Sequence, residues 1–374
     1  MSEGSSPQVS RWLGSTSVKR ASHLVHHVRL RLSRYGVAEQ PATCAIFKVT
    51  DACNARCSTC NVGQPGYRPV AARMPRESAL RTVDQLAKNG VLFLGIVGGE
   101  PLLYPHVMDV LAASRDAGIR VNLNTHGGLV SVEKAQELAV RKLGYASISL
   151  DSPDPARNDL MRKGIRFESA LTGIANLRSH SPGTGIAIGM TLSRANLSEA
   201  AAMCRLAAEL GVGYVKFQPM HMHLDQSTVG DDDREQMALS DADIPALLAH
   251  LSDAQAVAHR TGIRCNARML TAELPDVLRG QRRLRCVAGR TVLFVDSNGH
   301  VGGCPQERTR GSLFDEDLVD LMAREHGVFR LADACPKLAS CFETTYGELS
   351  HLQGRVGPSH ALDVFDRLLF YGQS

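Results

Sequence analysis

A chain of 374 residues with 44% hydrophobic residues can bury a large core, either as one large domain with an appendage or as two domains. Ten cysteines are too dilute in such a chain for a disulfide framework, and we find neither a secretory signal nor an apolar run of about 18 residues, so we expect a cytoplasmic protein. The net charge of +4 is mild, which argues against nucleic-acid binding.

The N-terminal extension, residues 1–43, carries an excess of positive charge. Only Glu3 and Glu39 oppose its basic side chains, which are Arg11, Lys19, Arg20, Arg29, Arg31 and Arg34. Apolar residues that recur there at helical spacing are Val25, Val28 and Leu32. This pattern predicts an amphipathic helix that packs its apolar stripe against the main domain. Contact with an anionic membrane surface or with a lipid-like substrate is the alternative.

Residues 44–240 alternate between two hydrophobic patterns. Apolar runs rich in Val, Ile and Leu predict strands at residues 45–50, 91–97, 120–125, 146–150, 185–192 and 214–218. Stretches of helical period predict helices at residues 78–88, 107–116, 132–142, 169–178 and 198–210. Left-handed C-cap residues are expected at Gly90, Gly118 and Gly211. The βα alternation predicts an α/β fold with a parallel sheet, and periodicity alone permits either a curved barrel or a flat doubly wound sheet.

Three cysteines, Cys53, Cys57 and Cys60, follow the first predicted strand in the pattern Cys-x3-Cys-x2-Cys. Three thiolates from one loop supply three ligands of an iron-sulfur cubane and leave one iron open, and an open iron can bind and activate another molecule. A zinc knuckle is the alternative, although zinc sites prefer paired Cys-x2-Cys units with four ligands close at hand. The pattern therefore predicts a [4Fe-4S] cluster where the first strand ends.

A second motif, Gly98-Gly99-Glu100-Pro101, follows the second predicted strand. Two glycines let the backbone approach a ligand, and the Glu100 carboxylate can accept a charge-assisted hydrogen bond from an amine. Together with the cysteine motif, this run resembles the radical S-adenosylmethionine (radical SAM) enzymes. The resemblance implies a partial (βα)6 TIM-like barrel, S-adenosylmethionine (SAM) bound at the open iron, and a glycine run that holds the methionine ammonium.

Polar side chains stand at the ends of the later strands, where parallel strands converge on one mouth. Alternation places Ser149 and Asp151 on one face of the fourth strand, where the resemblance implies contact with the ribose or the methionine carboxylate of SAM. Arg162 is predicted to be a carboxylate partner, with an exposed loop arginine as the alternative. The further residues predicted to line the mouth are Asn124, Thr191 and Gln218.

Three residues are candidates for chemistry on the substrate. Lys216 and His221 lie near the end of the sixth strand and are candidate bases, although their segment can equally be a surface loop. Cys265 lies in a strand-like segment after a helix predicted at residues 244–260. Its thiol can donate a hydrogen atom to a substrate radical, and a packed core cysteine is the alternative.

Residues 284–345 contain four further cysteines. The segment at residues 291–304 predicts two short strands around an Asn-Gly turn, and connecting elements fill residues 241–283. The arrangement resembles the twitch or SPASM-like domain of radical SAM enzymes, a small β-hairpin and helix unit with an auxiliary [4Fe-4S] cluster, and zinc is the alternative. The cysteines are Cys286, Cys304, Cys335 and Cys341. A helical tail, with its helix at residues 361–370, is predicted for residues 346–374.

The resemblance implies an enzyme that reductively cleaves SAM to a 5′-deoxyadenosyl radical and abstracts a hydrogen atom from its substrate. Because only 43 residues precede the first strand, we expect a small molecule, such as a sugar or aminocyclitol, rather than a peptide that needs a leader-recognition domain. The expected reaction is oxidation or epimerisation, with flavodoxin or ferredoxin as electron donor. The alternatives are a peptide or lipid-like substrate, and a non-catalytic iron-sulfur or zinc protein.

Overall fold

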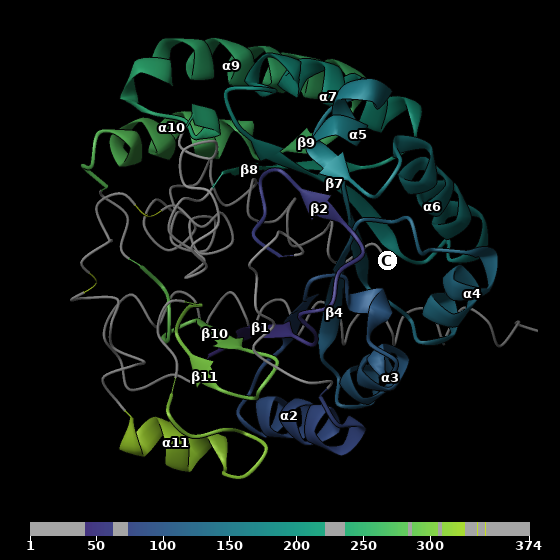
Figure 1. Cartoon of the computed structure of the whole chain (residues 1–374), viewed down its shortest axis with the longest axis vertical. Helices are drawn as coiled ribbons and strands as arrows, with labels where there is room; N and C mark the ends of the chain where they lie inside the picture. The colour runs from purple at the N-terminus through teal and green to yellow at the C-terminus, as the bar shows by residue number, and fades with distance from the viewer. Residues whose placement is uncertain are drawn as a thin grey trace, which may run out of the picture.

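The computed structural model describes residues 42–62, 74–220, 236–282, 286–305 and 309–325, together with Cys335 and Cys341. Its centre is a nine-stranded sheet with the strand order β11-β10-β1-β3-β4-β5-β7-β8-β9 (Figure 1). Neighbouring strands are parallel, except for β10 and β11. The strands of this sheet are β1 (Cys44–Lys48), β3 (Phe93–Val97), β4 (Arg120–Thr125), β5 (Tyr145–Ser149), β7 (Gly185–Leu192), β8 (Tyr214–Pro219), β9 (Arg264–Cys265), β10 (Val292–Val295) and β11 (Val301–Gly302).

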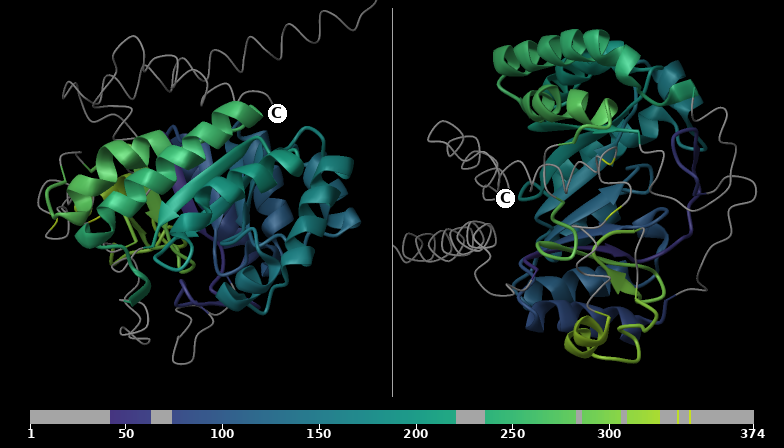
Figure 2. Two further views of the ribbon diagram at one scale, coloured as in Figure 1. Left: turned by 90° about the horizontal axis from the view of Figure 1, so that it is seen from above. Right: turned by 90° about the vertical axis from the view of Figure 1, so that its left-hand side faces the viewer.

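Helices follow one another around the outside of the sheet (Figure 1). They are α2 (Arg76–Lys88), α3 (Val107–Asp116), α4 (Val132–Val140), α5 (Pro155–Met161), α6 (Phe167–His180), α7 (Ala200–Glu209), α9 (Ile244–Thr261), α10 (Ala267–Leu278) and α11 (Leu318–Arg324). Short 3-10 turns are η1 (Pro101–Leu103), η2 (Leu197–Glu199) and η3 (Asp241–Asp243). In the side view of Figure 2, the strands lie between α9 and α10 at one end and α2 and α3 at the other. This α/β architecture is a partial barrel.

The two faces of the sheet differ in polarity. On the helix-covered face, apolar side chains such as Phe47, Leu123 and Phe217 are fully buried. Alternation turns the next residues of the same strands to the opposite face, which is half-buried and carries polar side chains. These include Lys48, Asn124, Ser149, Thr191, Lys216 and Gln218. The polar face is therefore where the barrel can receive a ligand.

All six predicted strands are confirmed, as β1, β3, β4, β5, β7 and β8. Gly90, Gly118 and Gly211 have φ angles of 82°, 75° and 65°, so the predicted left-handed caps are confirmed. Helix α5 was missed, although Asp154 caps its N-terminus and Pro155 occupies the first turn, a recognised start signal.

The C-terminal hairpin is less separate than the sequence indicated. Strand β10 pairs in parallel with β1, with Cys44 opposite Val292 and Phe47 opposite Val295, and so extends the main sheet. Its four residues, Val292–Val295, are all buried, as expected for a strand covered on both faces.

Some predictions fall on segments outside the described residues: the basic helix within residues 1–43, His221, and the helix at residues 361–370. Among the helices that the structure describes, none has both the length and the apolar character needed to cross a membrane.

Candidate functional site

The first cysteine loop, defined as residues 51–60, leaves the carboxyl end of β1 and carries the thiols of Cys53, Cys57 and Cys60, none of which forms a disulfide in the described structure. Within it, β2 (Arg56–Cys57) pairs with β6 (Arg162–Lys163), the segment that follows α5. The Ser58 N–H extends this ribbon by donating to the Met161 carbonyl at 2.8 Å. The loop is thereby tied to a segment about one hundred residues later in the chain.

Gly98 and Gly99 let the same loop approach β3. A Cβ atom at Gly98 would lie 2.7 Å from the Thr50 carbonyl oxygen, and one at Gly99 would lie 2.3 Å from that of Ala52. The N–H groups of Gly99 and Glu100 donate to these two carbonyls at 2.8 Å. The sequence predicted a close approach of backbone to ligand, and in the structure Thr50 lies where a side chain at Gly98 would be, while Ala52 and Cys53 of the cysteine loop lie where one at Gly99 would be.

Glu100 is enclosed by the protein, with 1% of its surface exposed. Its carboxylate accepts from the Leu102 N–H at 3.0 Å, the Thr125 hydroxyl at 2.7 Å and the His126 N–H at 2.9 Å. Burial raises the pKa of this carboxyl despite these donors. These three donors hold the carboxylate within the protein, and the prediction that Glu100 also accepts from an amine stays a prediction. Pro101 is buried and begins η1.

His126 connects Glu100 to the cysteine loop. Its Nδ1 accepts from the Gly128 N–H at 3.0 Å, and its Nε2 lies 2.9 Å from Asn54 Oδ1 and 3.3 Å from Glu100 Oε2. Burial, together with the Arg162 guanidinium, lowers the pKa of His126 to about 4, so the ring is neutral and Nε2–H donates to Asn54. Since Asn54 lies between Cys53 and Cys57, this chain fixes the loop from within. The sequence places His126 at the end of a predicted strand, but it does not predict that His126 holds the cysteine loop through Asn54.

Asp151 and Arg162 form a buried ion pair, with Nε and Oδ2 2.9 Å apart and relative exposures of 0% for Asp151 and 9% for Arg162. Asp151 Oδ1 also accepts from the Thr191 N–H at 2.8 Å. Arg162 Nη1 lies 3.9 Å from Cys57 Sγ, where its charge opposes the rise that burial causes in the thiol pKa. The predicted residues Asp151, Arg162 and Thr191 therefore meet beside Cys57 of the cysteine loop. Asp151 is buried and holds Arg162, so the exposed-arginine alternative is wrong, while the predicted contact of Asp151 with SAM stays a prediction.

The remaining predicted polar residues lie together on the half-buried face. Thr191 of β7 pairs with Gln218 of β8, and Gly189 pairs with both Lys216 and Ser149 on its two sides. Asn124 lies on the same face of β4. This face can accommodate the parts of a ligand that extend away from the cysteine loop.

Cys265 lies on the other face of the sheet. It pairs in parallel with Val215, which is fully buried under the helices, and residues in register share a face. There its thiol hydrogen-bonds that of Cys204 on α7, and this bond and burial raise the pKa of Cys204. The prediction that Cys265 faces the mouth and donates a hydrogen atom is wrong, because a two-residue strand has no periodicity from which to read its register.

Two of the C-terminal cysteines lie at the opposite end of β1. Cys286 and Cys304 pack with Cys44 against a small apolar group of Val287, Ala288 and Val292. Cys335 and Cys341 are half-buried, and the Cys341 carbonyl accepts from Arg282 Nη1 at 2.7 Å.

The donor set of the first loop fits a cubane cluster better than a single ion. Within the described ranges, no three His, Cys, Asp or Glu side chains converge closely enough to hold one metal ion. A cubane does not require its ligands to converge on one point, because each thiolate binds a different iron. Beside Cys60, the Oδ1 atom of Asn61 is buried and has no hydrogen-bond partner in the described structure, which leaves an acceptor for a bound group.

Comparisons with known proteins agree with this geometry. Residues 47–207 match the family model of the Radical SAM superfamily. AdoMet-dependent heme synthase of Methanosarcina barkeri is 32% identical over 167 residues, 44% of this chain and 47% of that protein. Mycofactocin maturase MftC of Mycolicibacterium smegmatis is 26% identical over 272 residues, 70% of this chain and 64% of that protein. The chain thus spans about half the length of the heme synthases that it matches.

The fold has solved counterparts. The structure of Streptococcus suis SuiB bound to the precursor peptide SuiA superimposes with a TM-score of 0.63 at 17% identity, covering 83% of this chain and 73% of that one. SuiB has also been solved with bound SAM. Residues 47–207 therefore match the radical SAM superfamily, and this match implies a [4Fe-4S] cluster and SAM as cofactors.

Proposed function

We propose that this chain reductively cleaves SAM and abstracts a hydrogen atom from a peptide substrate. The observation that carries the proposal is the anchoring of the first cysteine loop by three independent contacts: the close approach at Gly98 and Gly99, the hydrogen bond from His126 to Asn54, and the pairing of β2 with β6. A loop held in this way presents its thiols in one fixed arrangement, as a cluster with an open iron requires.

Cys53, Cys57 and Cys60 would hold the cluster, which with SAM supplies a 5′-deoxyadenosyl radical. Arg162, held by Asp151 beside Cys57, places a fixed positive charge next to the thiolates. The polar face, with Lys216 and Gln218, orients the substrate, and the sheet and its helices keep water from the reacting carbon. An electron donor such as flavodoxin or ferredoxin would reduce the cluster before SAM is cleaved, since the cleavage consumes one electron.

A peptide substrate is supported by the relatives. One is the mycofactocin maturase, another is PqqA peptide cyclase of Streptomyces rochei at 28% identity, and the SuiB structure contains a precursor peptide. These names favour the peptide alternative over the sugar or aminocyclitol predicted from the sequence.

A tetrapyrrole is a second candidate substrate, since relatives include AdoMet-dependent heme synthase and Fe-coproporphyrin III synthase of Methanosarcina barkeri. Lys216 on the polar face is suited to a carboxylate of such a molecule.

The proposal includes an auxiliary [4Fe-4S] cluster at Cys286, Cys304, Cys335 and Cys341. It is supported by the packing of Cys286 and Cys304 in one apolar group and by the sequence pattern, and zinc is the alternative. Anaerobically reconstituted protein should then hold about eight irons.

The test is the release of 5′-deoxyadenosine from SAM by reconstituted protein with dithionite. We expect release from the wild type and none from the variant in which Cys53, Cys57 and Cys60 are all alanine. Release in the triple variant, or none in cluster-loaded wild type, contradicts the proposal. Comparing synthetic peptides encoded near this gene with iron-coproporphyrin as stimulants of release then separates the two substrate classes.

A further inference from the structure

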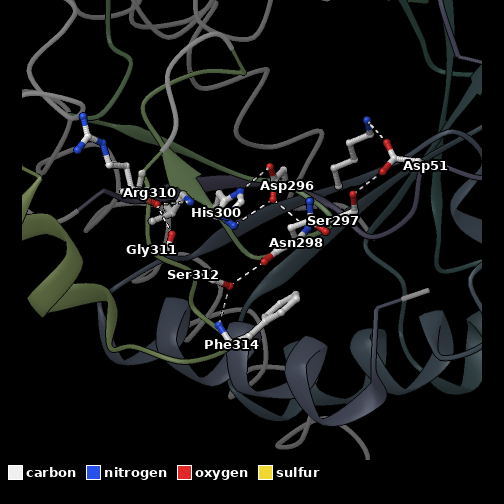
Figure 3. Close-up of polar contacts among 12 residues, drawn as sticks. Asp51, Asp296, Ser297, Asn298, His300, Arg310, Gly311, Ser312 and Phe314 are labelled. Carbon is white, nitrogen blue, oxygen red and sulfur yellow. Dashed lines mark hydrogen bonds and ion pairs between the residues drawn. The ribbon is translucent and has the colours of Figure 1, made fainter. Parts of the chain in front are cut away.

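The turn between β10 and β11 contacts the first cysteine loop through one buried carboxylate (Figure 3). The Ser297 hydroxyl donates to Asp51 Oδ2 at 2.5 Å, and Lys48 of β1 forms an ion pair with Asp51 Oδ1. The Asp51 side chain is 1% exposed, and Asp51 lies two residues before Cys53. A carboxylate buried to this degree needs both partners, because a buried acceptor without a donor is costly.

The turn itself is rigid, so the position of the Ser297 hydroxyl is set by the hairpin. Asp296 Oδ1 accepts from the N–H groups of Asn298 at 2.9 Å and His300 at 3.0 Å. The Ser312 hydroxyl donates to the Asn298 carbonyl at 2.7 Å from the other side (Figure 3). Gly299 has a φ of +79°, and a Cβ there would lie 2.6 Å from the Phe314 ring. These contacts together fix the backbone conformation of the turn.

The contact extends the pairing of β10 with β1 beyond the backbone ladder. The ladder ends with Phe47 opposite Val295, and loops follow both strands, after Lys48 of β1 and after Val295 of β10. Ser297 and Asp51 reconnect these loops through side chains. In the opposite direction, β11 runs back along the sheet toward Cys304, which packs with Cys44 at the amino end of β1. One hairpin therefore contacts the first cysteine loop at its turn and carries a C-terminal cysteine at its base.

We infer that Ser297 is a positioning residue for the first cysteine loop, which it holds through Asp51 and Lys48. The Ser297 hydroxyl is then the link between the hairpin turn and the loop, so that removing this hydroxyl disturbs the geometry of the SAM-binding cluster. The expected effect on the cluster rests on the proposed function. The contact of Ser297 with Asp51 can be tested in the protein without any cofactor.

The experiment compares Ser297→Ala with two other variants. Ser312→Ala removes a hydroxyl that contacts the turn at the Asn298 carbonyl but does not touch Asp51, and the two hydrogen bonds that Asp296 accepts still hold the turn. Ser297→Thr keeps the hydroxyl. Hydrogen exchange of residues 51–60 is measured by mass spectrometry in the full-length apo protein. We expect Ser297→Ala to speed exchange there about fivefold, the loss expected for one hydrogen bond, and Ser312→Ala and Ser297→Thr to leave it unchanged. An equal rise in Ser312→Ala, or none in Ser297→Ala, overturns the inference.

A second readout uses the reconstituted protein. The EPR spectrum of the reduced first cluster, recorded with and without SAM, should differ from wild type in Ser297→Ala and match it in the two other variants. An identical SAM-induced shift in Ser297→Ala contradicts the positioning role even when wild type cleaves SAM. If wild type cleaves no SAM, the proposed function fails, while the apo exchange experiment still decides the inference.

Discussion

The first cysteine loop and the C-terminal cysteines Cys286 and Cys304 are held by different forces. Polar groups from four elements fix the loop: His126 after β4, Arg162 of β6, Ser297 of the hairpin turn and the backbone of Gly99 after β3. Cys286 and Cys304 are held instead by apolar packing against Val287, Ala288 and Val292. Polar networks specify one geometry and fail when a member is lost, whereas apolar packing tolerates adjustment. Single substitutions should therefore affect the loop more sharply.

The two sites also lie at opposite ends of one strand. Cys44 begins β1 and packs with the C-terminal pair, while the first cysteine loop follows its last residue, Lys48. Five residues of strand span about 16 Å, so the sites are distinct but within one rigid element. Loss of one site should leave the other intact.

The largest effect is expected for Cys57→Ala. Removing this thiolate should abolish release of 5′-deoxyadenosine while about four of the eight proposed irons remain, because Cys286 and Cys304 pack with Cys44 at the other end of β1. Iron analysis and a SAM-cleavage assay on the same preparation measure this. Complete loss of iron would show that the two sites form together, contrary to the comparison.

Asp151→Ala should be the most destabilising change at the loop. It leaves the buried Arg162 guanidinium without its partner and the Thr191 N–H without its acceptor, which is expected to lower the free energy of unfolding by about 3–5 kcal/mol. Urea unfolding of the apo protein measures this. Asp84→Ala is the control, because its ion pair with Lys88 is 56% exposed on the aspartate side and should contribute less than about 1 kcal/mol. Similar losses of unfolding free energy in both variants would mean that burial does not determine how much these two ion pairs contribute to stability.

Gly99→Ala should displace the cysteine loop, since the new Cβ would lie 2.3 Å from the Ala52 carbonyl oxygen. We expect a loss of about 1–3 kcal/mol in unfolding free energy and a lower iron content after reconstitution. Gly183→Ala is the matched control, because a Cβ there meets nothing within 4 Å. Equal iron contents in the two variants would contradict the close approach of Gly99 to the cysteine loop.

A smaller effect should appear in the pH dependence of stability. Burial lowers the pKa of His126 from 6.5 to about 4, so the unfolded chain binds a proton at pH values where the folded protein does not. This contribution to stability is complete above about pH 6.5 and is lost as the pH falls toward 4. Between pH 7 and pH 5.5 it amounts to about 1 kcal/mol. Urea unfolding of the apo protein at both pH values should show this component in the wild type and not in His126→Gln; its persistence in the variant would assign it to other groups.

Hydrophobic periodicity predicted the six barrel strands and their helices because burial on one face imposes it. The spacing of Cys53, Cys57 and Cys60 predicted the cluster site because ligand geometry is local. The role of Glu100 could not be predicted in this way, since its donors Thr125 and His126 come from the next strand and only the tertiary register brings them together. The same holds for Asp51 and Ser297, which are separated by 246 positions. Sequence spacing shows which groups can bind a cofactor, but not which of them the protein uses to hold its own loops.

The smallest effect is expected for substitution of Cys265. This substitution tests whether a side chain that could react with the substrate serves packing instead. The Cys265 thiol contacts Cys204 under the helices rather than the polar face, so Cys265→Ala should leave both SAM cleavage and turnover of the true substrate within about twofold of wild type. The small cavity left beside α7 should lower the unfolding free energy by about 1 kcal/mol. Cys204→Ala should cause a similar loss of stability, because both substitutions remove the same thiol contact. Loss of turnover in Cys265→Ala but not in Cys204→Ala would restore a role for this thiol on the substrate side of the sheet, and would require β9 to adopt another register.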